Sequence, residues 1–417
     1  MSDLFTRTVE SISEIIKFDS SQKPEKDGKP FGQGAADCLE YFLSLAASFG
    51  FETKNYENYA GEVIFGEGEE FAILCHLDVV PAGSGWTKDA FGGEIDYKNK
   101  KIWGRGAMDD KGPAVIVLYC LKDLKDSGFK PQKKIKLIVG CNEENGWECI
   151  NYYKKHAHMP ETGFSPDADF PAIYAEKGIL QLKLKFPCAG NFTRLKGGNR
   201  ANMVCDFCEV CAPDNGNLKK YGLEIKDGAI ISKGKSAHGS TPELGKNAIE
   251  PVLEYLGLNE MHSLLFEDGF GLKKFKDETG ELTFSPDVIE QKEGFIEVIC
   301  DVRYPATYAK DDVIKEIEKK HVPFEITHFQ APLYGDKDGL AGELSAIYNE
   351  VTGKNLKPVA IGGGTYARAL KCGVAFGPEE AGEESTIHRA DEYITFEKIE
   401  KCLKIYRLAI ERLTCKP

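Results

Sequence analysis

The sequence contains no long apolar run and no excess of positive charge. None of its stretches approaches the roughly 18 to 20 consecutive apolar residues of a membrane-spanning helix, and its first residues lack the basic and apolar regions of a signal peptide. The 53 Lys and Arg residues are outnumbered by 66 Asp and Glu residues, which gives a net charge of −13. This balance disfavours nucleic acid and anionic membranes as partners. We therefore expect a cytoplasmic protein with no membrane association.

Paired cysteines are also lacking. The 13 cysteines are odd in number and lie among apolar residues, which favours reduced, buried thiols. Cys205, Cys208 and Cys211 lie close together, but they fall in a strand-like segment and no second pair of ligands follows. A structural zinc site there is disfavoured.

The length and the periodicity of the chain predict two domains. At 417 residues the chain exceeds one ordinary core. Helical spacing alternates with short apolar strands up to residue 177 and again from residue 333, whereas the segment between them has mainly half-exposed strands. The expected organisation is an α/β domain formed by residues 1–177 and 333–417, interrupted by an inserted α+β domain at residues 178–332.

Individual elements follow from the same patterns. Ser2 is expected to cap the first helix. The expected helices are at about 2–18, 35–49, 113–124, 245–255, 309–320, 339–352 and 396–413, with another from residue 365. The expected strands are at about 61–66, 71–75, 93–97, 101–103, 133–140, 172–176, 179–186, 203–211, 223–226, 229–233, 294–303, 356–361 and 373–377.

The strand expected at residues 71–75 leads directly to His76 and Asp78. These two side chains point the same way in an extended chain, and sites in open α/β sheets lie beyond the carboxyl ends of the strands. An imidazole is a common metal ligand, and a nearby carboxylate commonly fixes its orientation. The alternative is that His76 ends a strand and Asp78 turns the chain.

Further acidic residues follow other expected elements. Each pair has an ordinary explanation: Asp109 and Asp110 could cap a helix, Glu143 and Glu144 could open one and be stabilised by its dipole, and Asp169 could be a turn residue. Together with His388 they predict a histidine-poor acidic cluster at one edge of a sheet. Such donors suit two divalent cations such as zinc or manganese, and a carboxylate that binds neither metal could take a proton from water.

These segments resemble a known family, the dinuclear metallopeptidases that include PepV-type dipeptidases, carnosinases, aminoacylases and succinyl-diaminopimelate desuccinylases. The similarity spans nearly the whole chain and is nearest to the PepV-type branch. It is carried by residues 76–81 (His-Leu-Asp-Val-Val-Pro), 103–112 (Trp-Gly-Arg-Gly-Ala-Met-Asp-Asp-Lys-Gly), 142–144 (Asn-Glu-Glu), 165–171 (Ser-Pro-Asp-Ala-Asp-Phe-Pro), 176–178 (Glu-Lys-Gly), 235–239 (Lys-Ser-Ala-His-Gly), 362–366 (Gly-Gly-Gly-Thr-Tyr) and 385–388 (Ser-Thr-Ile-His).

The resemblance implies a metallopeptidase catalytic domain, with a central mixed sheet flanked by helices, and a lid domain inserted into it. It also implies two divalent metal ions, with zinc favoured and manganese or cobalt as alternatives. Asp109 would bridge the metals, in a cis peptide with Asp110. The remaining ligands would be His76 and Asp167 at one metal, and Glu144 and His388 at the other.

Other roles come from the same resemblance. Glu143 would be the general base that acts on a metal-bridged hydroxide, and Asp78 would support His76. From the lid, His238 would donate to the oxyanion and Arg303 would bind the substrate carboxylate. The alternative for Arg303 is that it ends a strand and pairs with a local carboxylate. Asn202, Gly364 and Thr365 would complete the substrate site, the last two at a turn that opens a helix.

The resulting hypothesis is a dipeptidase that hydrolyses the peptide bond of small peptides. In this family an aspartate at the position of Asp167 goes with dipeptidases and aminopeptidases, whereas a glutamate goes with carboxypeptidases and acylases. The alternatives are an N-acyl amino acid deacylase or desuccinylase, which uses the same chemistry, and a non-catalytic metal-binding protein. The chain is shorter than the PepV-type branch leads one to expect, and the protein is either a monomer or a homodimer.

Overall fold

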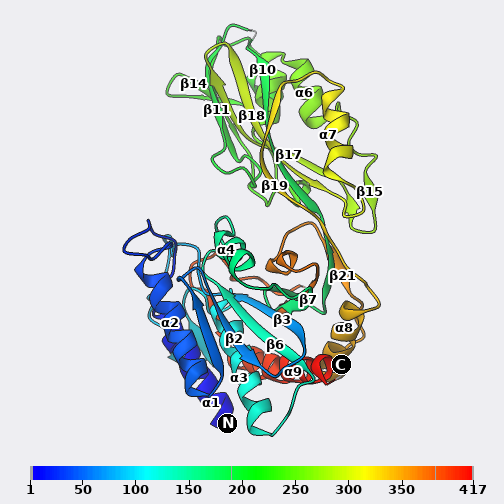
Figure 1. Cartoon of the computed structure of the whole chain (residues 1–417). Coiled ribbons are helices and arrows are strands. Elements are labelled where there is room, and N and C mark those ends of the chain that lie inside the picture. Colours follow the sequence, from blue (N-terminus) through cyan, green and yellow to red (C-terminus); the bar gives the residue numbers. More distant parts are fainter. Residues whose placement is uncertain (1–2, 189, 381, 416–417) are drawn as a thin grey trace. The chain divides into compact units, whose positions relative to one another are not determined.

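The computed structural model describes residues 3–188, 190–380 and 382–415, so the expected cap at Ser2 lies outside the described residues. The chain divides into two compact units. Unit 1 comprises residues 1–174, 335–359 and 365–417, and unit 2 comprises residues 175–334 and 360–364. Because both ends of the chain belong to unit 1, the blue helices and the red helix of Figure 1 come from the same unit.

The helices of unit 1 are amphipathic, as their spacing predicts. The third helix is buried along almost its whole length and contacts the first and the last helix. The helices are α1 (Asp3–Ile16), α2 (Gln33–Ser48), α3 (Lys111–Asp126), α4 (Glu148–His156), α8 (Leu340–Thr352) and α9 (Phe396–Thr414).

A mixed sheet forms the centre of unit 1. Its pairs are antiparallel at the β1 end, parallel from β6 to β22, and antiparallel again at β9. In spatial order the strands are β1 (Glu52–Tyr56), β2 (Ala60–Phe65), β6 (Lys133–Gly140), β3 (Glu69–His76), β7 (Thr162–Ser165), β22 (Cys372–Ala375), β9 (Ile173–Glu176) and β20 (Leu333–Tyr334), with β21 (Val359–Ile361) also paired to β9.

Helices cover both faces of this sheet. Two neighbouring residues of β2 show this, because each contacts a different helix. A Cβ atom at Gly61 would lie 2.7 Å from Leu39 of α2, while the next side chain, Glu62, accepts a hydrogen bond from Tyr153 of α4. Successive side chains of a strand point to opposite faces. The predicted fold class, an α/β domain with a mixed sheet flanked by helices, is confirmed.

The parallel strands end together at one edge of the sheet. His76, at the end of β3, pairs with Gly140 at the end of β6, and Ser165, at the end of β7, pairs with Ala375 at the end of β22. The loops that leave these ends carry the predicted Glu143, Asp167 and His388.

Asp109 and Asp110 reach this edge by another route. They follow β5 (Lys101–Trp103), which lies in a separate sheet with β4 (Glu94–Asp96) and β24 (Tyr393–Thr395). The strand expected before them is therefore present, but it lies outside the central sheet. Their loop ends at α3, and the helix N-terminus brings them to the edge. Two further strands of unit 1, β8 (Ala168–Phe170) and β23 (Pro378–Glu380), form a parallel pair.

Unit 2 is built on an antiparallel sheet of eight strands. In order they are β13 (Glu224–Lys226), β14 (Ala229–Lys233), β12 (Phe207–Cys211), β11 (Thr193–Gly197), β17 (Thr283–Lys292), β18 (Phe295–Tyr304), β10 (Gly178–Pro187) and β19 (Phe324–Gln330). Its helices are α5 (Ile249–Leu256), α6 (Asn259–Phe266) and α7 (Lys310–Glu318), with the short 3₁₀ turns η1 (Leu218–Tyr221) and η2 (Pro242–Leu244) and the hairpin β15 (Lys276–Asp277) and β16 (Gly280–Glu281).

Several expectations for single elements were wrong. The strand expected from residue 203 begins only at Phe207, and the helix expected from residue 365 is a four-residue 3₁₀ turn, η3 (Tyr366–Ala369). Strand β17 was not predicted, because Pro286 interrupts its pattern and prolines are rare inside strands. A bulge between Pro286 and Val288 accommodates the proline.

No helix among the described residues is long and apolar enough to span a membrane.

Gly163 of β7 tests how closely the central strands approach. A Cβ atom there would lie 2.1 Å from the backbone oxygen of Ala72 in β3, so Gly163→Ala must push two paired strands apart. We expect a loss of about 1–3 kcal/mol in the free energy of unfolding, measured by urea denaturation. Cys372→Ala, at an exposed position on the adjacent strand β22, should change stability little. Equal stability of the two variants would contradict the close approach.

Candidate metal centre and active site

His76 presents one ring nitrogen to a group of carboxylates. Its Nδ1 lies 3.0 Å from the backbone oxygen of Asp78, and because a carbonyl oxygen can only accept, Nδ1 must carry a proton. In the neutral ring Nε2 then has a free lone pair. This Nε2 lies 2.9 Å from Asp109 Oδ1 and 3.6 Å from Asp167 Oδ2. It is buried and makes no well-aligned hydrogen bond among the described residues.

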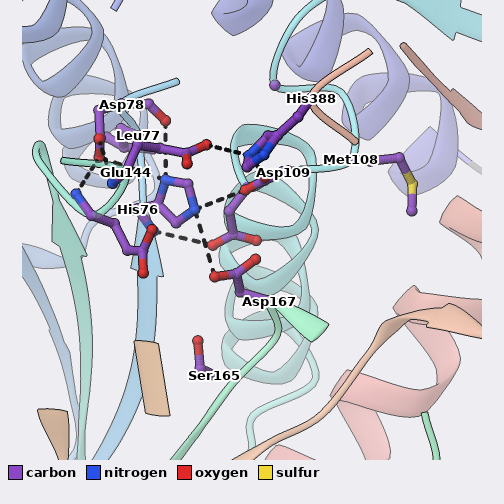
Figure 2. A network of polar contacts seen from close by, with 12 residues as sticks. His76, Leu77, Asp78, Met108, Asp109, Glu144, Ser165, Asp167 and His388 are labelled. Carbon is purple, nitrogen blue, oxygen red and sulfur yellow. Dashed lines mark hydrogen bonds and ion pairs between the residues drawn. The ribbon is translucent and has the colours of Figure 1, made fainter. Parts of the chain in front are cut away.

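Asp109 lies between two imidazole rings. Its Oδ1 faces His76, while its Oδ2 lies 2.9 Å from Nε2 of His388. The same His388 nitrogen lies 2.9 Å from Glu144 Oε1. Figure 2 shows the two rings on either side of the Asp109 carboxylate, with Asp167 below Asp109 in this view. The Asp109–Asp110 peptide is cis, as expected.

The electrostatics of this cluster reflect crowded carboxylates with little access to water. Burial lowers the pKa of His388, but Asp109 and Glu144 outweigh it and raise this pKa to about 11. Burial and Asp109 raise the pKa of Glu144 to about 7, against the influence of His388. Burial also holds the pKa of Glu143 well above its usual range. The cluster therefore favours bound positive charge.

The donors fit divalent cations. Two sets of ligand atoms lie within 4.8 Å of one another among the described residues: His76, Asp109 and Glu144, and His76, Glu143 and Asp167. Imidazole nitrogen and carboxylate oxygen suit zinc, manganese or cobalt, and a neutral His76 would direct its lone pair at two carboxylates unless a cation lies between them. Neither set contains a cysteine.

Asp78 contributes differently from the expected carboxylate–imidazole contact. Its backbone oxygen, rather than its carboxylate, accepts the His76 hydrogen bond, since the carboxylate Oδ1 lies 3.6 Å from Nδ1. The carboxylate accepts the backbone N–H groups of Glu143 and Glu144 at 2.9 and 3.1 Å. The glutamates do not open a helix, because α4 begins at Glu148. Asp78 therefore fixes the backbone of the two glutamates, and its own negative charge adds to the factors that raise the pKa of Glu143.

Trp147 and Tyr366 are neighbours of the site that the sequence interpretation did not identify as functional. Trp147 has a left-handed backbone, with φ of 63°, and its indole Nε1 donates to Glu143 Oε1 at 3.2 Å. Tyr366 is buried and places its ring edge-to-face with both His76 and Trp147. These contacts orient Glu143 and the His76 ring. Tyr366 ends the motif at residues 362–366, but only its neighbours Gly364 and Thr365 were assigned a role, and Trp147 belongs to none of the motifs.

Glu392 was also missed, although it connects two ligand loops. It is fully buried, and its Oε1 accepts the backbone N–H groups of Gly106 and Met108 at 3.1 and 2.9 Å, and that of Asp109 at 3.4 Å. Its Oε2 accepts from Arg105 Nη1 at 2.7 Å. The loop of Asp109 is thereby held against the segment that follows His388. The backbone of His388 itself is left-handed, with φ of 60°.

The predicted residues of unit 2 lie close to one another. A bridge pairs Met203 with His238, and the N–H of Gly239 donates to the backbone oxygen of Asn202 at 2.7 Å. A Cβ atom at Gly239 would lie 3.1 Å from the side chain of Asp301, which is bonded to Arg303.

The protonation of His238 follows from its neighbour. The N–H of Ser240 donates to Nδ1 of His238 at 3.1 Å, so Nδ1 is an acceptor. The neutral ring must then carry its proton on Nε2.

Gly364 and Thr365 lie on either side of a unit boundary. The Thr365 hydroxyl caps η3 by accepting from the N–H of Ala367. This short 3₁₀ turn does not provide the helix N-terminus that was expected to receive an anion.

The chain matches the model of peptidase family M20/M25/M40 over residues 72–412. The chain belongs to this family. The predictions of the family and of a peptide-bond hydrolase are thereby confirmed.

Relatives and solved structures agree with the family. YtjP of Bacillus subtilis (strain 168) is 37% identical over 93% of this chain and 92% of its own. The beta-Ala-Xaa dipeptidase of Lactobacillus delbrueckii subsp. lactis is 35% identical over 97% and 96%. The dipeptidase Dug1p of Saccharomyces cerevisiae has the same fold, with a TM-score of 0.61 at 13% identity over 99% of this chain and 96% of its own.

Glu392→Gln tests whether the buried carboxylate positions the ligand loops. The amide has only one acceptor oxygen, so it cannot accept both from Arg105 and from the backbone N–H groups, and it leaves a guanidinium that is 2% exposed without its counter-charge. We expect zinc affinity to fall by about 10- to 100-fold, as for other groups that hold metal ligands in place, measured by competition with a chromophoric chelator. Glu384→Gln, at an 87% exposed side chain, should bind zinc as the wild type does. Unchanged affinity in Glu392→Gln would contradict the role.

Proposed function

We propose that this protein is a metal-dependent dipeptidase that hydrolyses the peptide bond of free dipeptides. The observation that carries the proposal is the carboxylate cluster around His76 and His388, with Glu143 held beside it by Trp147. The beta-Ala-Xaa dipeptidase of L. delbrueckii, which aligns over 96% of its length, supports the substrate class. β-Alanyl dipeptides are therefore the first substrates to test.

Five residues of unit 1 are proposed to hold two divalent cations. Asp109 would bind both, because its two oxygens face the two different histidines. His76 and Asp167 would complete one site, and Glu144 and His388 the other. Zinc is the proposed metal, with manganese or cobalt as alternatives. Bound ions would supply Lewis acidity that polarises the peptide carbonyl and lowers the pKa of water.

Glu143 is proposed to move the proton. Its carboxylate would accept a proton from the attacking water and deliver it to the leaving amine nitrogen as the C–N bond breaks. Its raised pKa suits a group that must both accept and release a proton. Asp78 holds the backbone of Glu143, and Trp147 holds its side chain.

Unit 2 is proposed to act as a lid that supplies binding groups. His238 would donate its Nε2 proton to the oxyanion, where such donors act mainly in the transition state. Arg303 would bind the carboxylate of the substrate, and Asn202, Gly364 and Thr365 would line the same site. Residues 1–177 with 333–417 and residues 178–332 remain the proposed catalytic and lid domains, and we infer a cytoplasmic monomer or homodimer.

The second candidate, deacylation of N-acyl amino acids, needs the same metals but no free amine. Asp167 favours the dipeptidase within the family pattern. A comparison of β-alanyl dipeptides with their N-acetyl and N-succinyl derivatives separates the two functions. We expect kcat/KM to be highest for the free dipeptides with zinc or manganese added. Faster cleavage of the acylated compounds would instead establish a deacylase.

Glu143→Ala tests the general base and the metal ligands together. We expect kcat to fall by at least about 100-fold, because proton transfer loses its positioned group. Metal content, measured by mass spectrometry of the purified protein, should stay at the wild-type level. Glu148→Ala, at an exposed position on α4, is the matched control and should retain activity.

The same variant also distinguishes two roles of Glu143. The grouping of Glu143 with His76 and Asp167 is compatible with a ligand as well as a base. Loss of metal together with activity would make Glu143 a ligand, and full activity would remove it from the mechanism.

A further inference from the structure

Arg303 is held by one carboxylate on its own strand. Asp301 and Arg303 are two residues apart on β18, so their side chains lie on one face of the sheet. Nε of Arg303 donates to Asp301 Oδ1 at 2.5 Å, and Nη2 donates to Oδ2 at 3.0 Å. The two side chains are 5% and 0% exposed. The Nε–Nη2 edge of the guanidinium is therefore already occupied.

This contact determines which edge of Arg303 can meet a ligand. A guanidinium has five N–H donors in a rigid fork, and Asp301 takes one from Nε and one from Nη2. The Nη1 donors and the second Nη2 donor form the remaining edge, which suits an end-on carboxylate. Because the bidentate pair leaves no free rotation, the direction of that edge is fixed by Asp301.

Asp301 also supports the turn that contains His238. The Cβ and Cγ atoms of Asp301 would each lie 3.1 Å from a Cβ atom at Gly239, so a side chain at residue 239 would crowd the carboxylate. Gly239 in turn bonds to Asn202. One buried side chain thus contacts both the arginine and the loops of the other proposed substrate contacts.

A second buried carboxylate nearby does not share this role. Asp287 lies on the neighbouring strand β17, is 0% exposed, and accepts a hydrogen bond from Ser285. Its other oxygen has no hydrogen bond among the described residues. Asp287 therefore offers a matched control, a carboxylate of similar burial on the same sheet that does not bond to Arg303.

We propose that Asp301 is a positioning residue that aims the Nη1–Nη2 edge of Arg303 at the terminal carboxylate of the substrate, and so sets the preference for dipeptides with a free C-terminus. The proposal rests on the proposed function. It predicts that replacement of Asp301 changes kcat/KM for substrates that carry the carboxylate and leaves kcat/KM almost unchanged for substrates that lack it.

The test compares a β-alanyl dipeptide with its C-terminal amide in zinc-loaded full-length protein. In the wild type we expect kcat/KM to favour the free carboxylate. Arg303→Ala should remove this preference. Asp301→Asn should reduce the preference by at least about 10-fold, through a higher KM for the free acid, because displacement of a positioned group by about 1 Å is costly. Kinetics with the amide should change little.

Controls separate positioning from folding. Asp287→Asn should keep the wild-type preference. Asp301→Asn combined with Arg303→Ala should show the preference of Arg303→Ala alone, because Asp301 has nothing left to position. If Asp301→Asn does not fold, Asp301→Glu keeps the buried charge pair while shifting the carboxylate, and the same loss of preference is expected.

Two results would overturn the proposal. A wild-type preference in Asp301→Asn would show that the pair does not position Arg303, and equal losses with acid and amide would assign Asp301 a purely structural role. Failure of the wild type to cleave any free dipeptide would instead remove the proposed function itself. A wild type that cleaves acid and amide equally well would leave the peptidase intact and remove Arg303 as the carboxylate-binding group, and with it the role of Asp301.

Discussion

The structure depends on carboxylates gathered in a place where water cannot stabilise them. Asp109, Asp110 and His76 are almost completely buried, and Glu143 and Glu144 follow immediately on the adjacent strand end. Burial raises the pKa of Asp110 well above its usual range. In such surroundings each negative charge needs a cation or a set of N–H donors. Protonated histidines or divalent ions can supply the positive charge, and the folded backbone supplies the N–H donors.

Two carboxylates outside the proposed ligand set show how the backbone does this. Asp78 accepts N–H groups from the loop of the two glutamates, and Glu392 accepts N–H groups from the loop of Asp109. Each carboxylate ties one loop to another, and the loops carry the groups that meet at the centre. In unit 2, Asp301 has a comparable relation to Arg303. The positions of the candidate functional side chains are thus set by residues that need not contact the reacting atoms.

The sequence predicted the features that repeat along the chain and missed those that depend on one contact. Strand β6 was predicted with its observed bounds, because Ile135 and the apolar run of residues 137–139 form a short stretch rich in β-branched residues. Strand β17 was missed, since only a bulge lets Pro286 lie inside it. The route of Asp109 to the site was not predicted, because residues 101–103 also pair with a strand near the C-terminus that no local pattern could reveal. Glu392 bonds to a backbone segment that is distant in the sequence, and Trp147 bonds to Glu143 from a residue with an irregular, left-handed backbone. Neither residue belongs to a periodic hydrophobic pattern.

The path of the chain also limits how this architecture can be inherited. Unit 2 includes residues 360–364 in addition to residues 175–334, so it is not a single cassette placed between two halves of unit 1. A recombination event that exchanged only the long insertion would leave the short segment adapted to a different partner. A chimera built from two relatives would therefore have to take both segments from the same parent to keep unit 2 intact.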